Sequence, residues 1–380
     1  MSKKKILILI DWFYPGFKAG GPIQSCVNMV KALKDDFEIF VMTTDTDHGE
    51  LQPYDGIPTN QWIINAEFGT QLYYAKKKQL SFTEVSEQIK KIQPDFLYLN
   101  QLFSVKFVLY PLFLKLLNKI SCKVILNPRG TLYESALSHK RYKKMPFLFF
   151  FRLSGINKKI LFHATNDREK VAVESNFPKS TVLIADNLPN FQQDSFQSIP
   201  KSPGILKCIF VARIVAIKNL LFVLKALEKI NAQITFNIIG PKEDAEYWNT
   251  CEQKIKELND NIVVNYLGAL SNHEINRHVH ESHLFILPTL GENFGHAIFE
   301  SFLAGRPVLI SDQTPWLNLE AKNAGWDLPL NNMNAFSEKI QFISDCSQDQ
   351  YDVYSRGAWE LANQFISNPS LKGDYLKLFS

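Results

Sequence analysis

The chain has 380 residues, of which 46% are hydrophobic and 21% are charged, a composition typical of a globular protein with two domains of ordinary size. Its five cysteines are scattered without a CxxC pair, which argues against a zinc centre or a disulfide framework and favours a reducing cytosol. The net charge of +4 is uneven, with 26 Lys and Arg against 17 Asp and Glu in residues 1–190 and 16 against 21 in residues 191–380, so the first half is expected to face something anionic.

The N-terminal segment is expected to be a buried strand and not a leader peptide. Its apolar run, residues 6–10, ends at Asp11, whereas a signal peptide needs a longer apolar core and a small-residue cleavage site. The most apolar stretch, residues 102–117, is interrupted by Lys106 and Lys115. It is too short and too charged to cross a bilayer, so we expect no transmembrane helix.

Short apolar runs alternate with longer segments of helical period through the first half of the chain. This alternation is typical of a parallel sheet covered by helices. The predicted strands are residues 5–10, 37–44, 96–100, 123–128, 160–165 and 181–186, and the predicted helices include residues 21–35, 83–93 and 168–177.

Residues 187–204 break this alternation, because they are polar and aperiodic, and they are predicted to form an interdomain linker. The alternation then restarts. Strands are predicted at residues 207–213, 234–240, 262–268, 284–289 and 307–312, and helices at residues 219–230, 246–259, 271–282 and about 295–304.

The pattern predicts an α/β protein with two doubly wound Rossmann-like domains that face each other across a cleft, where ligands would bind near the carboxyl ends of the strands. The first domain is predicted at residues 1–186 and the second at residues 205–365, joined by the linker at 187–204. A C-terminal helix is expected within residues 366–380, and it could pack back on the first domain.

Two cations, Arg213 and Lys218, follow the first strand of the second domain. Arginine supplies a planar two-pronged donor and lysine a point charge, and the start of a helix adds free N–H groups. Together these groups could hold a diphosphate. The alternative is a pair of ordinary surface cations.

The stretch GENFGHAIFE (291–300) places two carboxylates around a glycine-containing turn after a buried strand. Glu292 lies before the predicted helix start near His296, and Glu300 lies about one turn inside the helix. Carboxylates accept hydrogen bonds from hydroxyl groups, so the two residues suit a ligand that carries a sugar, a diphosphate and a ribose. Alternatively, Glu292 is an acid favoured by the helix dipole and Glu300 is a surface charge.

Gly20 and Gly21 precede the first predicted helix. The surrounding sequence is neither GxGxxG nor a P-loop, but paired glycines allow the backbone to approach a phosphate or a sugar closely. A glycine used only for the turn is the alternative.

Residues 138–159 combine seven cations with no acid and include a run of phenylalanines. A basic face beside aromatic side chains suits attachment to an anionic membrane surface, and a core helix with a solvated flank is the alternative. Binding to nucleic acid is not expected, because no recognised motif accompanies the charge. Asp45 and Asp47 form a D-x-D pattern that is common by chance, and no metal is expected there.

Read together, these stretches resemble the retaining family-4-type glycosyltransferases (glycosyl transferases group 1) of the two-domain GT-B fold. The E-x7-E pattern within residues 291–300, followed by AGRPVLISD, is the most specific part, and the spacing of Arg213 and Lys218 also fits. Weaker similarities extend over most of the chain. The set PRGTL, HAT, TPW and GWDLPL is similar to members that build bacterial surface polysaccharides, such as capsule, O-antigen or exopolysaccharide.

The resemblance implies metal-independent, cofactor-free transfer of a hexose from a nucleotide sugar to a saccharide or polyprenyl-linked acceptor, in the cytoplasm or on the inner face of the plasma membrane. Arg213 and Lys218 would neutralise the leaving diphosphate, and Glu300 would bind the ribose. Glu292 would hold the donor sugar and phosphate together with the backbone of Asn293, Phe294, Gly295 and His296, while Gly240, Leu267, Gly268 and Leu270 would flank the base.

The first domain would bind the acceptor, with Gly20, Gly21 and Arg129 on its substrate-binding side. Many relatives place a histidine near the position that Arg129 or its neighbours occupy, so the resemblance leaves the catalytic helper of this domain unassigned. Two other classes remain open: a sugar-nucleotide epimerase or phosphorylase on the same fold, and a non-catalytic protein that binds a nucleotide sugar.

Overall fold

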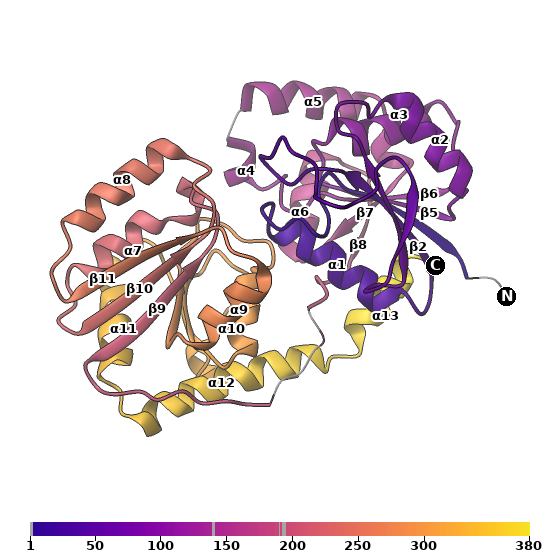
Figure 1. Ribbon diagram of the computed structural model, residues 1–380. Coiled ribbons are helices and arrows are strands. Elements are labelled where there is room, and N and C mark those ends of the chain that lie inside the picture. Colours follow the sequence, from indigo (N-terminus) through magenta and orange to yellow (C-terminus); the bar gives the residue numbers. More distant parts are fainter. Residues whose placement is uncertain (1–2, 139–140, 190, 192–194) are drawn as a thin grey trace. The chain divides into compact units, whose positions relative to one another are not determined.

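The computed structural model describes residues 3–138, 141–189, 191 and 195–380. The chain forms two compact units (Figure 1). Unit 1 comprises Met1–Asn190 together with Pro369–Ser380, and unit 2 comprises Phe191–Asn368. Each unit is built around its own sheet.

Unit 1 contains an eight-stranded sheet in the order β3-β4-β2-β1-β5-β6-β7-β8. All neighbouring strands are parallel except β3 and β4, which form an antiparallel hairpin at one edge. Strands that are buried over all or nearly all of their length, such as β5 and β1, explain the continuous apolar runs of the sequence. The strands are β1 (Lys5–Leu9), β2 (Glu38–Thr44), β3 (Trp62–Asn65), β4 (Thr70–Ala75), β5 (Phe96–Asn100), β6 (Lys123–Asn127), β7 (Leu161–Ala164) and β8 (Thr181–Ile184).

Helices cover both faces of this sheet, with α2, α3 and α5 on one side and α1 and α13 on the other (Figure 1). The C-terminal helix α13 packs on unit 1, because Tyr375 lies against the His163 ring and Phe379 against the Phe96 ring. The helical segments are α1 (Gly21–Leu33), α2 (Phe82–Ile92), η1 (Val105–Leu109), α3 (Tyr110–Leu116), α4 (Glu134–Ser138), α5 (Arg141–Leu153), η2 (Ile156–Lys158), α6 (Asp167–Asn176) and α13 (Ser370–Leu378).

Unit 2 contains a six-stranded, fully parallel sheet in the order β11-β10-β9-β12-β13-β14. Its strands are β9 (Ile205–Val211), β10 (Gln233–Ile239), β11 (Ile262–Gly268), β12 (Leu284–Leu287), β13 (Val308–Ser311) and β14 (Gly325–Leu328). The helical segments are η3 (Ala216–Lys218), α7 (Leu220–Leu227), α8 (Ala245–Lys256), α9 (Asn272–His280), α10 (His296–Leu303), η4 (Glu320–Lys322), α11 (Met333–Asp345) and α12 (Gln348–Ile366). The two sheets confirm the prediction of two doubly wound Rossmann-like domains.

Each sheet has one point at which the strand order reverses. In unit 1 the chain proceeds outward from β1 to β2 and then returns to place β5 on the other side of β1. In unit 2 it proceeds from β9 to β10 and β11 and returns to place β12 beside β9. The loops that leave these strand pairs separate at their carboxyl ends, and open α/β sheets bind ligands at such switch points.

Part of the predicted linker packs on unit 2. Lys201 is buried, and its ammonium donates to the Ser344 carbonyl at 2.6 Å, at the end of α11. Arg306 is also buried and donates to the Gln197 carbonyl. These contacts fix the segment from Gln197 to Lys201 on unit 2. No helix within the described ranges is long and apolar enough to cross a membrane.

Candidate active site

Arg213 and Lys218 lie in the loop that leaves β9 at the switch point of unit 2. Arg213 donates to Glu243 with a nitrogen–oxygen distance of 2.7 Å, and both side chains are a little over one third exposed. Lys218, the last residue of η3, pairs with Glu292 at 2.6 Å, and these side chains are only 13% and 20% exposed. Both predicted cations therefore carry a carboxylate partner, and the more buried pair joins two predicted site residues.

Backbone contacts between the loops after β9 and β12 explain why Lys218 meets Glu292. The Ile217 carbonyl accepts hydrogen bonds from the Leu290 N–H at 2.8 Å and from the Thr289 hydroxyl at 3.1 Å. The loop after β13 contributes as well, because the Glu292 N–H donates to the Gln313 carbonyl. Three loops are thus connected at the carboxyl edge of the sheet, and Glu292 is held between them.

Gly295 caps α10, which begins at His296 as the sequence predicts. Its φ of 79° lies in the left-handed region, and a Cβ there would come within 2.7 Å of the Ile298 side chain, so this turn strongly favours glycine. The preceding Phe294 is buried, and its carbonyl accepts a hydrogen bond from the Trp316 indole. The start of α10, together with Asn293, is therefore anchored to the core of unit 2.

Glu300 lies one turn inside α10 and is half-buried. Burial raises the pKa of its carboxyl group to about 7, because a low-dielectric environment disfavours the charged form. Among the described residues, no hydrogen bond or ion pair to this carboxyl group is found. Glu300 is therefore a carboxyl group available for an external partner.

The loop between β10 and α8 is fixed by glycine geometry. Gly240 has a φ of 145°, and a Cβ there would overlap the Ala212 carbonyl oxygen. Its N–H donates to the Gly268 carbonyl at 2.8 Å, and its carbonyl accepts from the Tyr266 hydroxyl at 3.0 Å. Leu267 and Leu270, which were predicted beside Gly240, are partly buried against the same core. The structure thus brings together the residues that were expected to flank a base.

Sequence reasoning did not single out Glu243, the partner of Arg213. The residue before it, Lys242, holds the loop, because its ammonium lies 4.0 Å from the centre of the Trp248 ring and 4.2 Å from that of Tyr266. Cation–π contacts of this kind restrain the side chain. The loop that carries Glu243 is therefore restrained by the contacts of Lys242, and we call it the braced loop. Three acidic residues follow Gly240 within the next six positions, so nothing in the local sequence distinguished Glu243 from its acidic neighbours.

In unit 1, Gly20 and Gly21 begin α1, with Gly20 at a φ of 68° and both residues exposed. Arg129 has a different environment. Its guanidinium donates to the Asn100 amide oxygen at 3.0 Å and to the Asn187 amide oxygen at 2.6 Å. The Arg129 side chain therefore connects the ends of β5 and β8 inside unit 1.

The turn that carries Arg129 is itself held from α6. Arg129 and Gly130 both have positive φ angles, of 55° and 72°, and the Gly130 N–H donates to the Glu169 carboxylate at 2.5 Å. Glu169 is fully buried and also accepts from the N–H and hydroxyl of Thr165. A left-handed arginine costs free energy, and the buried carboxylate compensates by satisfying the backbone of the next residue.

The D-x-D carboxylates are engaged by backbone groups. Asp47 accepts from the N–H groups of Phe17 and His48, and Asp45 accepts from that of Lys77. Across the described parts of the chain, no cluster of three or more His, Cys, Asp or Glu suited to a metal ion is found.

The predicted basic–aromatic segment corresponds mainly to α5, with Lys140 and His139 outside the described residues. Phe147, Leu148 and Phe151 pack toward the core of unit 1. Other apolar side chains of α5 are exposed: Tyr142, Met145, Phe149, Phe150 and Leu153. We call these five the outer face of α5. Arg141 and Arg152 on the same helix are also exposed.

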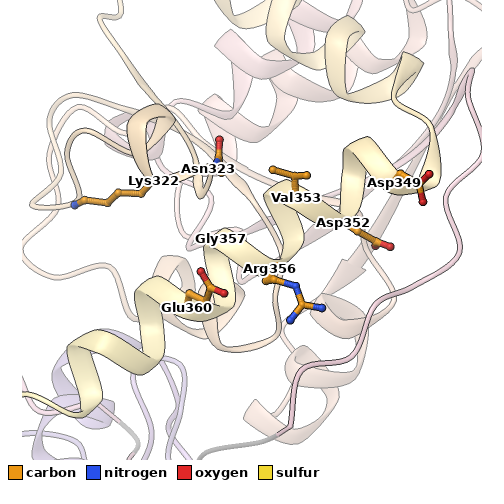
Figure 2. A pocket seen from close by; sticks show the side chains of 8 residues that line it. All are labelled: Lys322, Asn323, Asp349, Asp352, Val353, Arg356, Gly357 and Glu360. Atoms are coloured by element: carbon orange, nitrogen blue, oxygen red, sulfur yellow. The ribbon is translucent and has the colours of Figure 1, made fainter.

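A surface pocket of about 380 Å³ lies between α12 and η4 (Figure 2). Its lining carries both signs of charge, but Figure 2 shows Lys322, Arg356 and Asp349 pointing in different directions. Gly357 leaves room for the backbone of Asn323. The pocket therefore reflects close packing of α12, and its charged groups do not converge on a common point.

Comparison with known proteins adds three findings. Residues 191–359 match the family model described as glycosyl transferases group 1. A Klebsiella pneumoniae protein described as an uncharacterized 41.2 kDa protein in the cps region is 24% identical over 240 residues, which are 61% of this chain and 64% of that protein, less than two thirds of its length. The matched family segment contains Arg213, Lys218, Glu292 and Glu300.

Solved structures share the fold over almost the whole chain. Anabaena HepE in complex with UDP and glucose superposes with a TM-score of 0.72 at 14% identity, over 99% of both chains. Sucrose-phosphate synthase from Thermosynechococcus elongatus superposes with a TM-score of 0.72 at 13% identity, over 99% of this chain and 98% of that one. At such identities the superpositions establish the GT-B fold. The family segment lies within unit 2.

Proposed function

We propose that this protein is a retaining, family-4-type glycosyltransferase that moves a sugar from a nucleotide-sugar donor to a saccharide or lipid-linked acceptor. The observation that carries the proposal is the half-buried Lys218–Glu292 pair, in the same group of loops as Arg213 at the switch point of unit 2. This constellation lies within the family segment, and it combines cations for a diphosphate with a carboxylate for sugar hydroxyls.

Donor binding would exchange the partners of both cations. Arg213 and Lys218 would leave Glu243 and Glu292 and bind the diphosphate, which carries more charge than a carboxylate. The N-terminus of α10 adds N–H groups at the same edge of the sheet. Glu292, released from Lys218, would then accept hydrogen bonds from the hydroxyls of the donor sugar.

Glu300 supports the same proposal at the nucleoside end of the donor. Its carboxyl group has no internal partner among the described residues and has a pKa of about 7. Two ribose hydroxyls donating to it would favour the ionised form. The braced loop at Gly240 and the backbone at Leu267, Gly268 and Leu270 would flank the base.

Transfer would proceed on one face of the sugar. The bond between the anomeric carbon and the diphosphate oxygen breaks, the acceptor oxygen bonds to that carbon from the same side, and the acceptor proton passes to the leaving phosphate oxygen. Arg213 and Lys218 stabilise the charge that develops on the diphosphate, which is the largest contribution expected from the protein. The proposal invokes no metal and no other cofactor.

We extend the proposal to polysaccharide biosynthesis, for capsule, O-antigen or exopolysaccharide. The support is the similarity to a Klebsiella pneumoniae protein named for the cps region. We also propose a cytoplasmic protein that attaches to an anionic membrane through residues 138–159. The support is the outer face of α5, in which Phe149, Phe150 and Leu153 are 63%, 65% and 71% exposed beside Arg141 and Arg152.

The test is donor binding and sugar transfer by full-length variants. Binding of UDP-, GDP-, ADP- and dTDP-sugars is measured by calorimetry, and transfer with the donor that binds is measured with membrane-extracted lipid-linked saccharides. Arg213→Ala and Glu292→Ala should each lower transfer by about two to three orders of magnitude, with unfolding temperatures near that of the wild type.

Lys339→Ala is the matched control, because it removes the cation of another 2.6 Å ion pair of unit 2, with Glu320, that lies outside the site. Wild-type turnover in the Arg213 and Glu292 variants would refute the site assignment. Conversion of the donor without an acceptor would indicate an epimerase. A cofactor chromophore in the purified protein would indicate a phosphorylase. Donor binding with neither transfer nor hydrolysis would indicate a non-catalytic binding protein.

A further inference from the structure

The switch point of unit 1 carries a second cluster of polar groups, which the mechanism above does not use. β1 and β5 are the strands on either side of this switch point. Asp11 follows β1 and Ser104 follows β5, and the Ser104 hydroxyl donates to Asp11 Oδ1 at 3.0 Å. The hydrogen bond therefore joins the two loops between which an open α/β sheet binds ligands.

The Asp11 carboxylate is held in one orientation. The Asp11 carbonyl accepts hydrogen bonds from the Thr44 N–H and the Thr43 hydroxyl, which fix its backbone to the end of β2. Ser104 is fixed too, since its hydroxyl also accepts from the Phe107 N–H. A side chain held at both its backbone and one oxygen loses little further freedom when it binds a ligand.

Asp11 retains one carboxylate oxygen for an external donor. Within the described parts of the chain, Oδ2 of Asp11 has no hydrogen-bond partner, and the side chain is half-buried. Burial raises the pKa of this carboxyl group, while Ser104 and the ammonium groups of Lys77 and Lys106 act in the opposite direction. The lysines thus favour the charged form of a partly desolvated carboxyl group.

Buried polar groups beside Asp11 also lack partners. The Trp12 indole N–H and the Thr46 hydroxyl are both enclosed, and neither has a hydrogen-bond partner among the described residues. Trp12 is in the loop after β1 and Thr46 is in the loop after β2. Unsatisfied buried groups are uncommon and call for a ligand or a water molecule, and here they belong to loops at the carboxyl edge that also carries Asp11.

We propose that Asp11 and Ser104 form the acceptor site, in which the Asp11 carboxylate accepts a hydrogen bond from a hydroxyl of a saccharide acceptor and orients it. This inference rests on the proposed function, because it assigns the acceptor to unit 1. Carboxylates that accept from hydroxyls, next to aromatic and hydroxyl side chains, provide the chemistry that recognises a polyol. Asp11 binds and orients the acceptor, and the acceptor proton still leaves with the diphosphate.

The experiment uses the full-length protein and saturation-transfer NMR, which detects weakly bound small ligands. The probes are UDP and the methyl glycosides of glucose, galactose, mannose, N-acetylglucosamine and glucuronic acid. Asp11→Asn keeps the size of the side chain but removes its charge. Ser104→Ala leaves the carboxylate but removes its orienting hydrogen bond. Asp55→Asn, at an exposed position of unit 1, is the matched control.

We expect at least one methyl glycoside to bind to the wild type and to Asp55→Asn, and to bind about tenfold or more weakly to Asp11→Asn. The affinity of Ser104→Ala for the glycoside should lie between those of the wild type and Asp11→Asn. UDP binding should be unchanged in Asp11→Asn and weakened in Arg213→Ala, while glycoside binding should be unchanged in Arg213→Ala. Unfolding temperatures within a few degrees of the wild type would show that the variants are folded.

The inference is overturned if no glycoside binds, if the glycoside binds equally to Asp11→Asn, or if it is lost in Arg213→Ala. Failure of the proposed function gives a different pattern. In that case no nucleotide sugar or nucleoside diphosphate binds. Binding of a methyl glycoside that is weakened in Asp11→Asn would still show a saccharide site in unit 1.

Discussion

Replacing Glu243 with glutamine should tighten the binding of a nucleoside diphosphate. In the structure, Glu243 is the ion-pair partner of Arg213 at 2.7 Å, and the proposed mechanism requires the diphosphate to take its place. Glutamine is nearly isosteric and keeps a carbonyl oxygen that can accept from Arg213, but it carries no charge. The variant therefore lowers the free energy needed to release the guanidinium while leaving the loop intact.

The size of the effect follows from the exposure of the pair. The side chains of Arg213 and Glu243 are 39% and 35% exposed, so water and salt screen their attraction, and ion pairs of this kind contribute about 0.2 to 1 kcal/mol. Since 1.4 kcal/mol corresponds to a factor of ten, the Kd should fall by about 1.5- to 5-fold. The braced loop supports this estimate, because Lys242 fixes the loop against Trp248 and Tyr266 and the substitution should not let it collapse.

The assay is calorimetric titration with the nucleoside diphosphate that binds best to the wild type, at low and at physiological ionic strength. The difference between variant and wild type should shrink as salt is added, because the lost attraction is electrostatic. Glu246→Gln is the matched control, since it removes the same charge from an exposed position three residues away. Weaker binding in Glu243→Gln would refute the reasoning and show that Glu243 positions Arg213 for the donor. An equal gain in Glu246→Gln would show a long-range charge effect.

Three further predictions concern stability, pH and membranes. Gly240→Ala should lower the free energy of unfolding by at least about 3 kcal/mol, because the added Cβ would overlap the Ala212 carbonyl at a φ of 145°. Gly268→Ala is the control, because this glycine has a φ of 79° and open space around it, and it should lower the free energy of unfolding by only about 1 to 2 kcal/mol. Both values are measured by denaturant titration. The pKa of Glu300 is raised from 4.5 to about 7, so the folded state holds a proton that the unfolded chain has released, and the free energy of unfolding should fall as the pH rises from 5 to 8. Glu300→Gln should remove this slope, and an unchanged slope would contradict the assignment. Sedimentation should show that the protein binds to anionic vesicles and that this binding weakens as salt is added. The double variant Phe149→Ser/Phe150→Ser should bind less. Equal binding to neutral and anionic vesicles would show that the basic residues do not contribute to membrane attachment.

The alternation of strands and helices could be predicted from the sequence because fully buried parallel strands have continuous apolar runs. The predicted strand at residues 5–10 corresponds to β1 (Lys5–Leu9), and the one at residues 307–312 contains β13 (Val308–Ser311). The β3–β4 hairpin was missed; of its two strands, β3 has only four residues and is only partly buried at the sheet edge. The order of strands could not be predicted either, since pairing depends on contacts between distant segments.

The site could be predicted in part for a similar reason. The start of α10 at His296 and the grouping of Arg213 and Lys218 follow from local sequence, because a strand, a turn and a helix occur in succession. The Arg213–Glu243 pair spans 30 residues and the Arg129–Asn187 hydrogen bond spans 58. Such partners become neighbours only through the fold. For the same reason, the sequence placed Arg129 beside a substrate but could not show that its guanidinium is engaged inside unit 1.

The two switch points differ in the chemistry of the loops that flank them. In unit 2 the loops after β9 and β12 carry Arg213 and Lys218, and these two cations, once released from Glu243 and Glu292, would suit a ligand with several negative charges. In unit 1 the loops after β1 and β5 present the Asp11 carboxylate and the Ser104 hydroxyl, which suit a ligand with many hydroxyls. If both proposals hold, one topology, used twice, would offer a site for a phosphorylated donor and a site for a polyhydroxylated acceptor. Because the two sites are built on different sheets, Arg213→Ala and Asp11→Asn should act on different ligands, and a variant of either site that weakened both ligands equally would contradict this division of roles.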